Sequence, residues 1–207
     1  MFGDQAPLAE FAEVKARHNA YLAVDEAHSF GVFGANGRGL AEELGMEDKA
    51  DFIVGTFSKS LGATGGFLAS DHDVLDILRV ASRPYMYTAS LTPSVTASVL
   101  ATLERIRTDP ELRRTLWRNI EAVHRTVGAA GLPLCAGKGP VLAVKAPGPT
   151  EAYAMWKRLL DAGVYVNLAI PPGTPGGVSL LRCSVSAAHT PEQIEHIGEA
   201  LVTVWRE

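Results

Sequence analysis

Residues 55–66 read GTFSKSLGATGG, a run of small, hydroxyl-bearing and glycine residues with one lysine, Lys59, near its middle. No other charged residue lies between Asp51 and Asp71. We therefore expect the Lys59 ammonium group to be poorly solvated, because apolar strand and glycine-loop residues flank it. Burial lowers the pKa of a lysine, and a neutral amine can form a Schiff base. The run predicts a lysine with a chemical role.

Two short apolar runs precede polar loops and predict buried strands. The first, at 21–24, gives way abruptly to DEAHS at 25–29, and the second, at 51–57, leads into the lysine run. A helix predicted over 7–19 precedes the first strand, and a short helix at 40–45 lies between the two. This order predicts α/β construction with parallel strands.

Ligands of such sheets gather beyond the carboxyl ends of the parallel strands. Asp25, His28 and Lys59 all follow predicted strands at these ends. We expect them to lie together, with the Asp25 carboxylate buried behind the lysine. Each has an ordinary alternative: a structural lysine, an aspartate that caps a turn, and a histidine that is simply hydrogen-bonded.

The remaining chain divides into a helical part and a mixed part. Predicted elements are a strand at 67–70, a helix at 71–81 with Asp71 near its N-cap, helices at 93–108 and 110–130, strands at 141–144, 164–168 and 180–184, and helices at 149–162 and 191–205 with Thr190 as N-cap. Segment 83–91 is mixed, and the proline- and glycine-rich loop 171–177 is neither helix nor strand. We expect a partial large domain over 1–92, and a linker helix with a smaller α+β domain over 93–207.

Composition describes an ordinary globular protein. The 207 residues are 47% hydrophobic and 20% charged, with a net charge of -4, so no global attraction to nucleic acid or anionic membrane is expected. No stretch has the length of a transmembrane helix, and the N-terminus lacks a signal-peptide pattern. Cys135 and Cys183 make neither a disulfide framework nor a metal-site pattern. We expect a cytoplasmic protein without a metal.

An imine-forming lysine, a carboxylate and a nearby histidine are the set that pyridoxal 5'-phosphate requires. The aldehyde takes the lysine, and an aspartate beside the ring nitrogen keeps the pyridinium protonated. Thr56, Ser58 and the loop amides can donate to a phosphate. The order and spacing of these residues point to this cofactor more strongly than any one of them alone.

The motifs at 25–29, at 31–39 with its glycines, and at 55–60 closely resemble those of the α-oxoamine synthases. Further matching stretches are 83–91, 165–167 and 181–184. These fold-type I pyridoxal-phosphate enzymes condense an amino acid with an acyl-CoA and release carbon dioxide. The resemblance implies an α/β fold: the C-terminal part of the family's large domain, a mostly parallel sheet with helices, plus a smaller α+β C-terminal domain.

The resemblance also implies roles for the strand-end residues. Lys59 would bind the cofactor as an imine and then act as the base that removes the substrate Cα proton. Asp25 would pair with the pyridinium nitrogen, and His28 would hydrogen-bond the ring hydroxyl. Thr56 and Ser58 would hold the phosphate.

Other roles implied by the resemblance lie further along the chain. Thr88 and Ser90 match a hydroxyl segment that reaches the phosphate of the neighbouring subunit, which implies a homodimer with shared sites. Arg182 would bind the substrate carboxylate, a bidentate task that suits a guanidinium group. Its ordinary alternative is a structural arginine on a strand.

Within the family, the closest match is to the branch that joins L-serine to a long-chain acyl-CoA. The alternatives are glycine with acetyl-CoA, alanine with a pimeloyl thioester, glycine with succinyl-CoA, or an inactive fragment or partner subunit. Ile170 stands where an arginine is typical of that branch, before the double proline. Met1 falls in the middle of the family's large domain, so we expect an N-terminally truncated chain whose missing half includes the residue that stacks on the cofactor ring.

Overall fold

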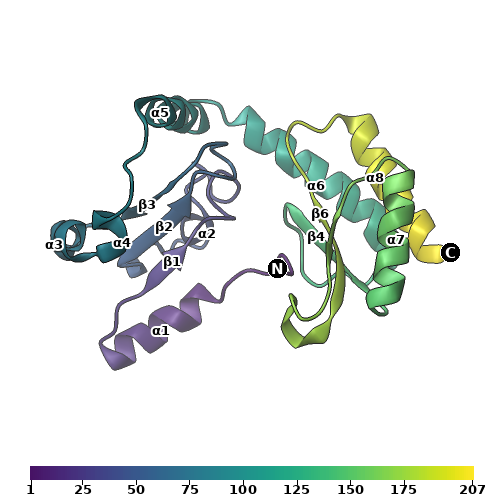
Figure 1. Ribbon diagram of the computed structural model, residues 1–207, viewed down its shortest axis with the longest axis horizontal. Coiled ribbons are helices and arrows are strands. Elements are labelled where there is room, and N and C mark those ends of the chain that lie inside the picture. The colour runs from purple at the N-terminus through teal and green to yellow at the C-terminus, as the bar shows by residue number, and fades with distance from the viewer. The chain divides into compact units, whose positions relative to one another are not determined.

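The computed structural model describes all 207 residues, and by its internal contacts it divides into two compact units (Figure 1). One unit is Ala6–Pro110, and the other is Glu111–Glu207 together with Met1–Gln5. The predicted domain boundary at residue 92 stays a prediction. No helix in the chain combines the length and apolar character needed to span a bilayer.

The Ala6–Pro110 unit is built on a three-stranded sheet of order β1-β2-β3 (Figure 1). Its strands are β1 (Ala23–Asp25), β2 (Phe52–Thr56) and β3 (Gly66–Ala69). β1 pairs with β2 in parallel, and β2 pairs with β3 antiparallel. The α/β class is thus confirmed, and this sheet has one pairing of each kind.

The helices of this unit lie close to where the sequence predicts them. They are α1 (Leu8–His18), α2 (Leu40–Glu43), α3 (Val74–Ala81), α4 (Arg83–Met86) and α5 (Pro93–Thr108), with a 3-10 turn at Glu47–Lys49. The expected N-cap at Asp71 is wrong: α3 starts later, and the His72 ring nitrogen Nδ1 accepts the Val74 N–H at 3.1 Å. The short helix α4 was not predicted; Pro84 lies in its first turn, where its missing N–H costs nothing.

Two apolar clusters hold the sheet and its loops. Under α1 and α2, one cluster joins Leu8, Val24, Leu40 and Ala41. The other joins Phe57, Leu61 and Val99, with Phe30 and Phe67 packed against it. The second cluster takes Phe57 and Leu61 from the two sides of Lys59, and Val99 from α5. It therefore anchors that run on both sides of Lys59.

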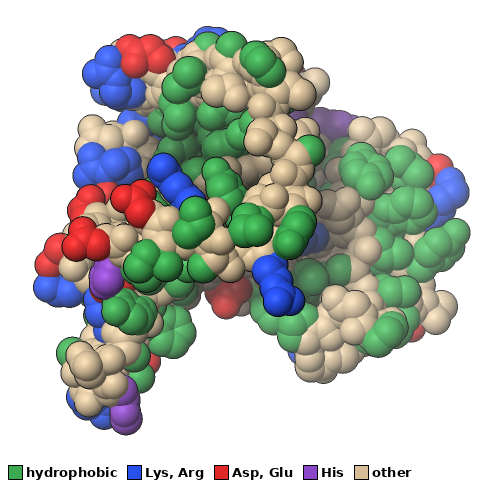
Figure 2. All heavy atoms as spheres, turned by 60° about the vertical axis from the view of Figure 1, so that its left-hand side comes forward, with side chains coloured by type: hydrophobic (Ala, Val, Ile, Leu, Met, Phe, Trp, Pro, Cys, Tyr) green, Lys and Arg blue, Asp and Glu red, His purple; other side chains and the backbone are tan.

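Apolar side chains also reach the surface (Figure 2). On α3, α4 and the residues after them, the exposed ones are Ile77, Val80, Tyr85, Met86, Tyr87 and Leu91. Tyr87 is 81% exposed. Exposed apolar side chains that gather in one stretch usually mark an interaction surface.

The second unit is an antiparallel sheet covered by helices (Figure 1). Its strands, β4 (Val141–Ala146), β5 (Asn167–Ala169) and β6 (Ser179–Ser184), are ordered β4-β6-β5. Its helices are α6 (Glu111–Ala129), α7 (Pro149–Asp161) and α8 (Pro191–Arg206), with a 3-10 turn at Pro175–Gly177. The predicted α+β arrangement is confirmed. β5 begins later than predicted, and Thr190 caps α8 in a full capping box with Gln193.

His124 is a buried titratable group in this unit. It lies on α6 with 8% of its surface exposed, and its Nε2 is 3.3 Å from the Gly139 carbonyl oxygen. Burial lowers the pKa of His124, the hydrogen bond to Gly139 partly offsets this, and the Lys138 charge lowers it further. The net shift is downward, so the folded protein favours the neutral imidazole.

This shift predicts a loss of stability in mild acid. Below the ordinary histidine pKa of 6.5, the unfolded chain binds a proton that the folded chain binds less readily. The contribution is therefore fully present above that pKa and is lost as pH falls through the folded pKa. Urea unfolding of the protein and of His124→Gln should show a steeper fall below about pH 6.5 for the protein. Equal slopes for the two would contradict the assignment.

Candidate active site

Lys59 lies on a tight loop just beyond the end of β2. The Phe57 N–H donates to the Gly65 carbonyl at 2.9 Å, and the Ala63 N–H donates to the Phe57 carbonyl at 2.8 Å. Phe57 and Leu61 point into the core, whereas Lys59 is exposed and its ammonium group makes no hydrogen bond or ion pair. The expectation of a poorly solvated lysine is therefore wrong for this chain, although the amine is unpaired and accessible.

Thr56 and Ser58 bring two hydroxyl groups together at the start of this loop. Their oxygens are 2.9 Å apart, and the Ser58 N–H donates to Thr56 Oγ1 at 3.3 Å. Thr56 Oγ1 also lies 3.2 Å from the Gly65 carbonyl oxygen. Two adjacent rotatable hydroxyls and a turn amide are donors that suit the oxygens of a phosphate.

Asp25 ends β1, the strand that runs parallel to β2 (Figure 1). Because Asp25 is in register with Val54, the two strands reach the same edge of the sheet, and Lys59 follows five residues later. The expectation that Asp25 is buried is wrong. Its side chain is exposed, and Oδ1 accepts the Ala27 N–H at 2.8 Å. His28, on the turn that follows, is exposed as well.

The buried carboxylate at this edge is Glu26, which sequence reasoning missed. Glu26 is 0% exposed and accepts the N–H groups of Leu40 and Ala41, each at 2.8 Å. The Ser29 hydroxyl donates to it as well. A signal was present in the sequence: two consecutive acids at a strand end point to opposite faces, so one of them had to be turned inward.

The loop that follows His28 packs closely against the lysine loop at Gly31. Gly31 has a φ of +80°, and a Cβ on it would lie 2.7 Å from the Ser60 Cβ. The Ser60 side chain therefore occupies the space that any larger residue would need. This contact fixes the distance between the two loops next to Lys59.

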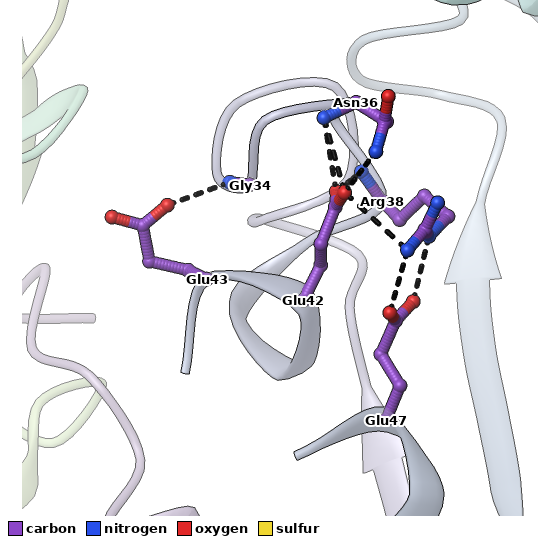
Figure 3. Close-up of polar contacts among 6 residues, drawn as sticks. All are labelled: Gly34, Asn36, Arg38, Glu42, Glu43 and Glu47. Atoms are coloured by element: carbon purple, nitrogen blue, oxygen red, sulfur yellow. Dashed lines mark hydrogen bonds and ion pairs between the residues drawn. The ribbon is translucent and has the colours of Figure 1, made fainter. Parts of the chain in front are cut away.

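Further along, the loop is held by acidic side chains (Figure 3). Glu42 accepts the N–H groups of Asn36 and Arg38, at 3.1 and 2.8 Å, and Glu43 accepts the Gly34 N–H at 2.9 Å. Burial raises the pKa of Glu42, but these hydrogen bonds and the Arg38 charge outweigh it and hold the pKa below its usual range. The Arg38 guanidinium also makes a bidentate pair with Glu47, with both bonds at 2.7 Å.

Thr88 and Ser90 follow α4, and both are exposed. Leu91 packs against the lysine loop, because a Cβ on Gly65 would lie 2.6 Å from Leu91 Cδ2. The segment that carries the two hydroxyls is thus fastened beside the loop of Lys59. Their side chains make no hydrogen bond in the chain.

Arg182 belongs to the other unit. It lies on β6, opposite Ala143 of β4 and Asn167 of β5. Its Nε is buried and has no hydrogen-bond partner. A cavity of about 410 Å³ opens beside it, lined among others by Tyr165, Asn167 and His189. Arg182 lines this cavity, and a guanidinium group there is suited to an anionic group such as a carboxylate.

An unpaired lysine beyond one strand and a carboxylate at the end of the parallel neighbouring strand are the arrangement that the sequence predicts for a pyridoxal-phosphate enzyme. The chain belongs to the aminotransferase class I and II family, whose model matches residues 1–201.

More specific likenesses exist within that class. The chain is 55% identical over 197 residues to the serine palmitoyltransferase of Caulobacter vibrioides, covering 95% of this chain and 49% of that protein. It is 37% identical over 204 residues to the 8-amino-7-oxononanoate synthase of Anaeromyxobacter sp., covering 99% of this chain and 51% of that protein. A solved serine palmitoyltransferase with a pyridoxal-phosphate internal aldimine is 46% identical with a TM-score of 0.95, covering 100% of this chain and 52% of that one. The chain thus spans about half the length of the relatives it matches.

The contact between Gly31 and Ser60 is open to a direct test. Gly31→Ala places a methyl group against Ser60 and strains a left-handed backbone, so we expect a loss of about 2–4 kcal/mol in unfolding free energy. Gly45→Ala is the matched control: its φ is +63° but nothing lies within 4 Å of the added Cβ. It should cost only the backbone strain, about 1–2 kcal/mol. Urea unfolding that gave equal losses would rule out a packing role for Gly31.

Proposed function

We propose that the chain carries the lysine-bearing part of a pyridoxal-phosphate-dependent acyltransferase, which condenses L-serine with a long-chain acyl-CoA to give a 3-keto amine. The observation that carries the proposal is the shared sheet edge of Asp25 and Lys59, with the Thr56–Ser58 hydroxyl pair between them in sequence. The likeness to serine palmitoyltransferases supports the choice of substrates.

The donor set on this edge fits the cofactor. When bound, pyridoxal phosphate supplies an aldehyde that condenses with amines and a pyridinium ring that stabilises a carbanion. Lys59 offers the unpaired amine, and its exposed ammonium group has no competing partner. Asp25 offers a carboxylate whose Oδ1 is already oriented by the Ala27 N–H, so that its other oxygen can hold a proton on the ring nitrogen.

Other residues would bind and orient. The Thr56 and Ser58 hydroxyls donate to the phosphate, and His28 hydrogen-bonds the ring hydroxyl. Arg182 would hold the carboxylate of the amino acid through its guanidinium group, which lines the cavity of its unit. Lys59 would also accept the Cα proton of the amino acid, since its amine is exposed and makes no ion pair in the chain.

The overall conversion releases coenzyme A and carbon dioxide besides the 3-keto amine. The Cα carbon loses its proton and forms a bond to the acyl carbonyl carbon, from which the thiolate of coenzyme A leaves. The carboxyl group departs as carbon dioxide, and a proton takes its place on Cα. The likeness to 8-amino-7-oxononanoate synthases supports a second candidate pair of substrates, alanine with a pimeloyl thioester. A homodimer is proposed too, since Thr88 and Ser90 lie among the exposed apolar residues of α4 and its neighbours.

The lysine assignment predicts a specific covalent product. Incubation with pyridoxal phosphate followed by borohydride should fix one phosphopyridoxyl group on Lys59, located by peptide mass spectrometry. Lys59→Ala should lose at least about 90% of it, because the substitution removes the amine that forms the imine. Lys49→Ala, which removes an exposed lysine paired with Asp48, should retain it. No fixed cofactor on the unmodified chain would favour an inactive fragment or partner subunit.

The substrate assignment predicts a selective release of coenzyme A and carbon dioxide. With cofactor present, we expect L-serine plus palmitoyl-CoA to give product at least about tenfold faster than alanine, or glycine, with shorter thioesters. Product mass identifies the amino acid and the acyl chain incorporated. Faster turnover of alanine with a pimeloyl thioester would replace the proposed substrates by those of the second family branch.

A further inference from the structure

We propose that Glu26 is a positioning residue of the candidate site: its buried carboxylate fixes the turn that presents Asp25 and His28. This inference rests on the proposed function, because the site that it positions is the cofactor site. Glu26 itself is fully buried and touches no solvent. It is therefore not placed in contact with a substrate or cofactor.

The two consecutive acids at the end of β1 point in opposite directions. Successive residues of a strand alternate between its faces, and here Asp25 is exposed whereas Glu26 is 0% exposed. The backbone is still paired at this point, because the Glu26 N–H donates to the Val54 carbonyl at 2.7 Å. A displacement of the Glu26 side chain is therefore transmitted through one peptide unit to Asp25.

The Glu26 carboxylate is held from three directions. Oε1 accepts the Ala41 N–H and Oε2 accepts the Leu40 N–H, each at 2.8 Å, and the Ser29 hydroxyl donates to Oε2. No cation pairs with it. Because a buried carboxylate is costly unless every donor is in place, the two oxygens fix the strand end against the start of α2.

The turn that Glu26 begins carries His28 and directly follows Asp25. The Glu26 carbonyl accepts the N–H groups of Ser29 at 3.1 Å and Phe30 at 2.8 Å, which wraps the chain around His28. On the other side, the Ala27 N–H orients the Asp25 carboxylate. The side chain and backbone of one residue thus tie together the strand end, the turn and the distant loop.

A glycine lies directly against the Glu26 carboxyl group. Gly39 has a φ of +121°, and a Cβ added to it would collide with the Glu26 carboxyl group. The glycine therefore allows the loop to close directly onto the carboxylate. A polar side chain that only filled space would not require both a glycine in contact with it and hydrogen bonds from two consecutive backbone N–H groups.

The test compares Glu26→Gln with the unmodified protein in cofactor binding. The amide keeps the size but replaces one acceptor with a donor, so either Leu40 or Ala41 loses its partner. We expect the dissociation constant of pyridoxal phosphate, from equilibrium dialysis, to rise about tenfold. The pH midpoint of the bound cofactor's visible band should also move upward, because a displaced Asp25 no longer holds a positive charge on the ring nitrogen.

Two further variants make the result decisive. Ser29→Ala removes only one donor, so it should keep its fold and shift both readouts in the same direction, with about a threefold change in dissociation constant. Glu42→Gln is the matched control, because it loses hydrogen bonds from Asn36 and Arg38 of the loop (Figure 3), whereas no hydrogen bond of the Glu42 side chain reaches the turn after Asp25. It should lower stability while leaving both readouts unchanged.

Each outcome bears on the proposal. It is overturned if Glu26→Gln binds and titrates like the unmodified protein, or if Glu42→Gln shifts the band midpoint equally, which would reduce Glu26 to a general structural role. If Glu26→Gln does not fold, an unchanged midpoint in Ser29→Ala overturns it. Failure of the unmodified protein to bind the cofactor at all would instead remove the proposed function, and this inference with it.

Discussion

The parallel pairing of β1 with β2 is the constraint on which the candidate site depends. It brings the chain from Asp25 and the chain from Thr56 out of the sheet at one edge, although the two are separated by a glycine-rich loop and α2. Parallel neighbours need such a long connection, and that connection is then available to shape the site. Here it supplies the turn with His28 and the loop that closes onto Glu26.

In the candidate site, each exposed functional side chain is next in sequence, or nearly so, to side chains that are buried. Lys59 is exposed between Phe57 and Leu61, which are both in the core, and Asp25 is exposed beside Glu26, which is fully buried. The apolar anchors hold the lysine loop by packing, whereas the carboxylate anchor holds the neighbouring turn by directional hydrogen bonds. Precise placement of accessible groups is what a covalent cofactor requires.

Much of this arrangement could be predicted from the sequence. The apolar runs at 21–24 and 51–57 end where β1 and β2 end within one or two residues, and the position of Lys59 beyond a strand follows from them. Solvent access could not be predicted, because an uncharged neighbourhood in sequence says nothing about what covers a side chain in space. For that reason the expected burial of Lys59 and Asp25 is wrong. The contacts of Glu26 with α2 and of Gly31 with Ser60 join residues far apart in sequence, which local patterns do not reveal.

An experimental structure with pyridoxal phosphate would show most directly whether Asp25 and Lys59 hold the two ends of one cofactor. We expect continuous density between Lys59 Nζ and the cofactor aldehyde carbon, with an Asp25 carboxylate oxygen about 3 Å from the ring nitrogen. A cofactor attached to Lys59 whose ring nitrogen faces another group would contradict the assignment of Asp25. A cofactor bound away from this sheet edge would contradict the assignment of both Lys59 and Asp25.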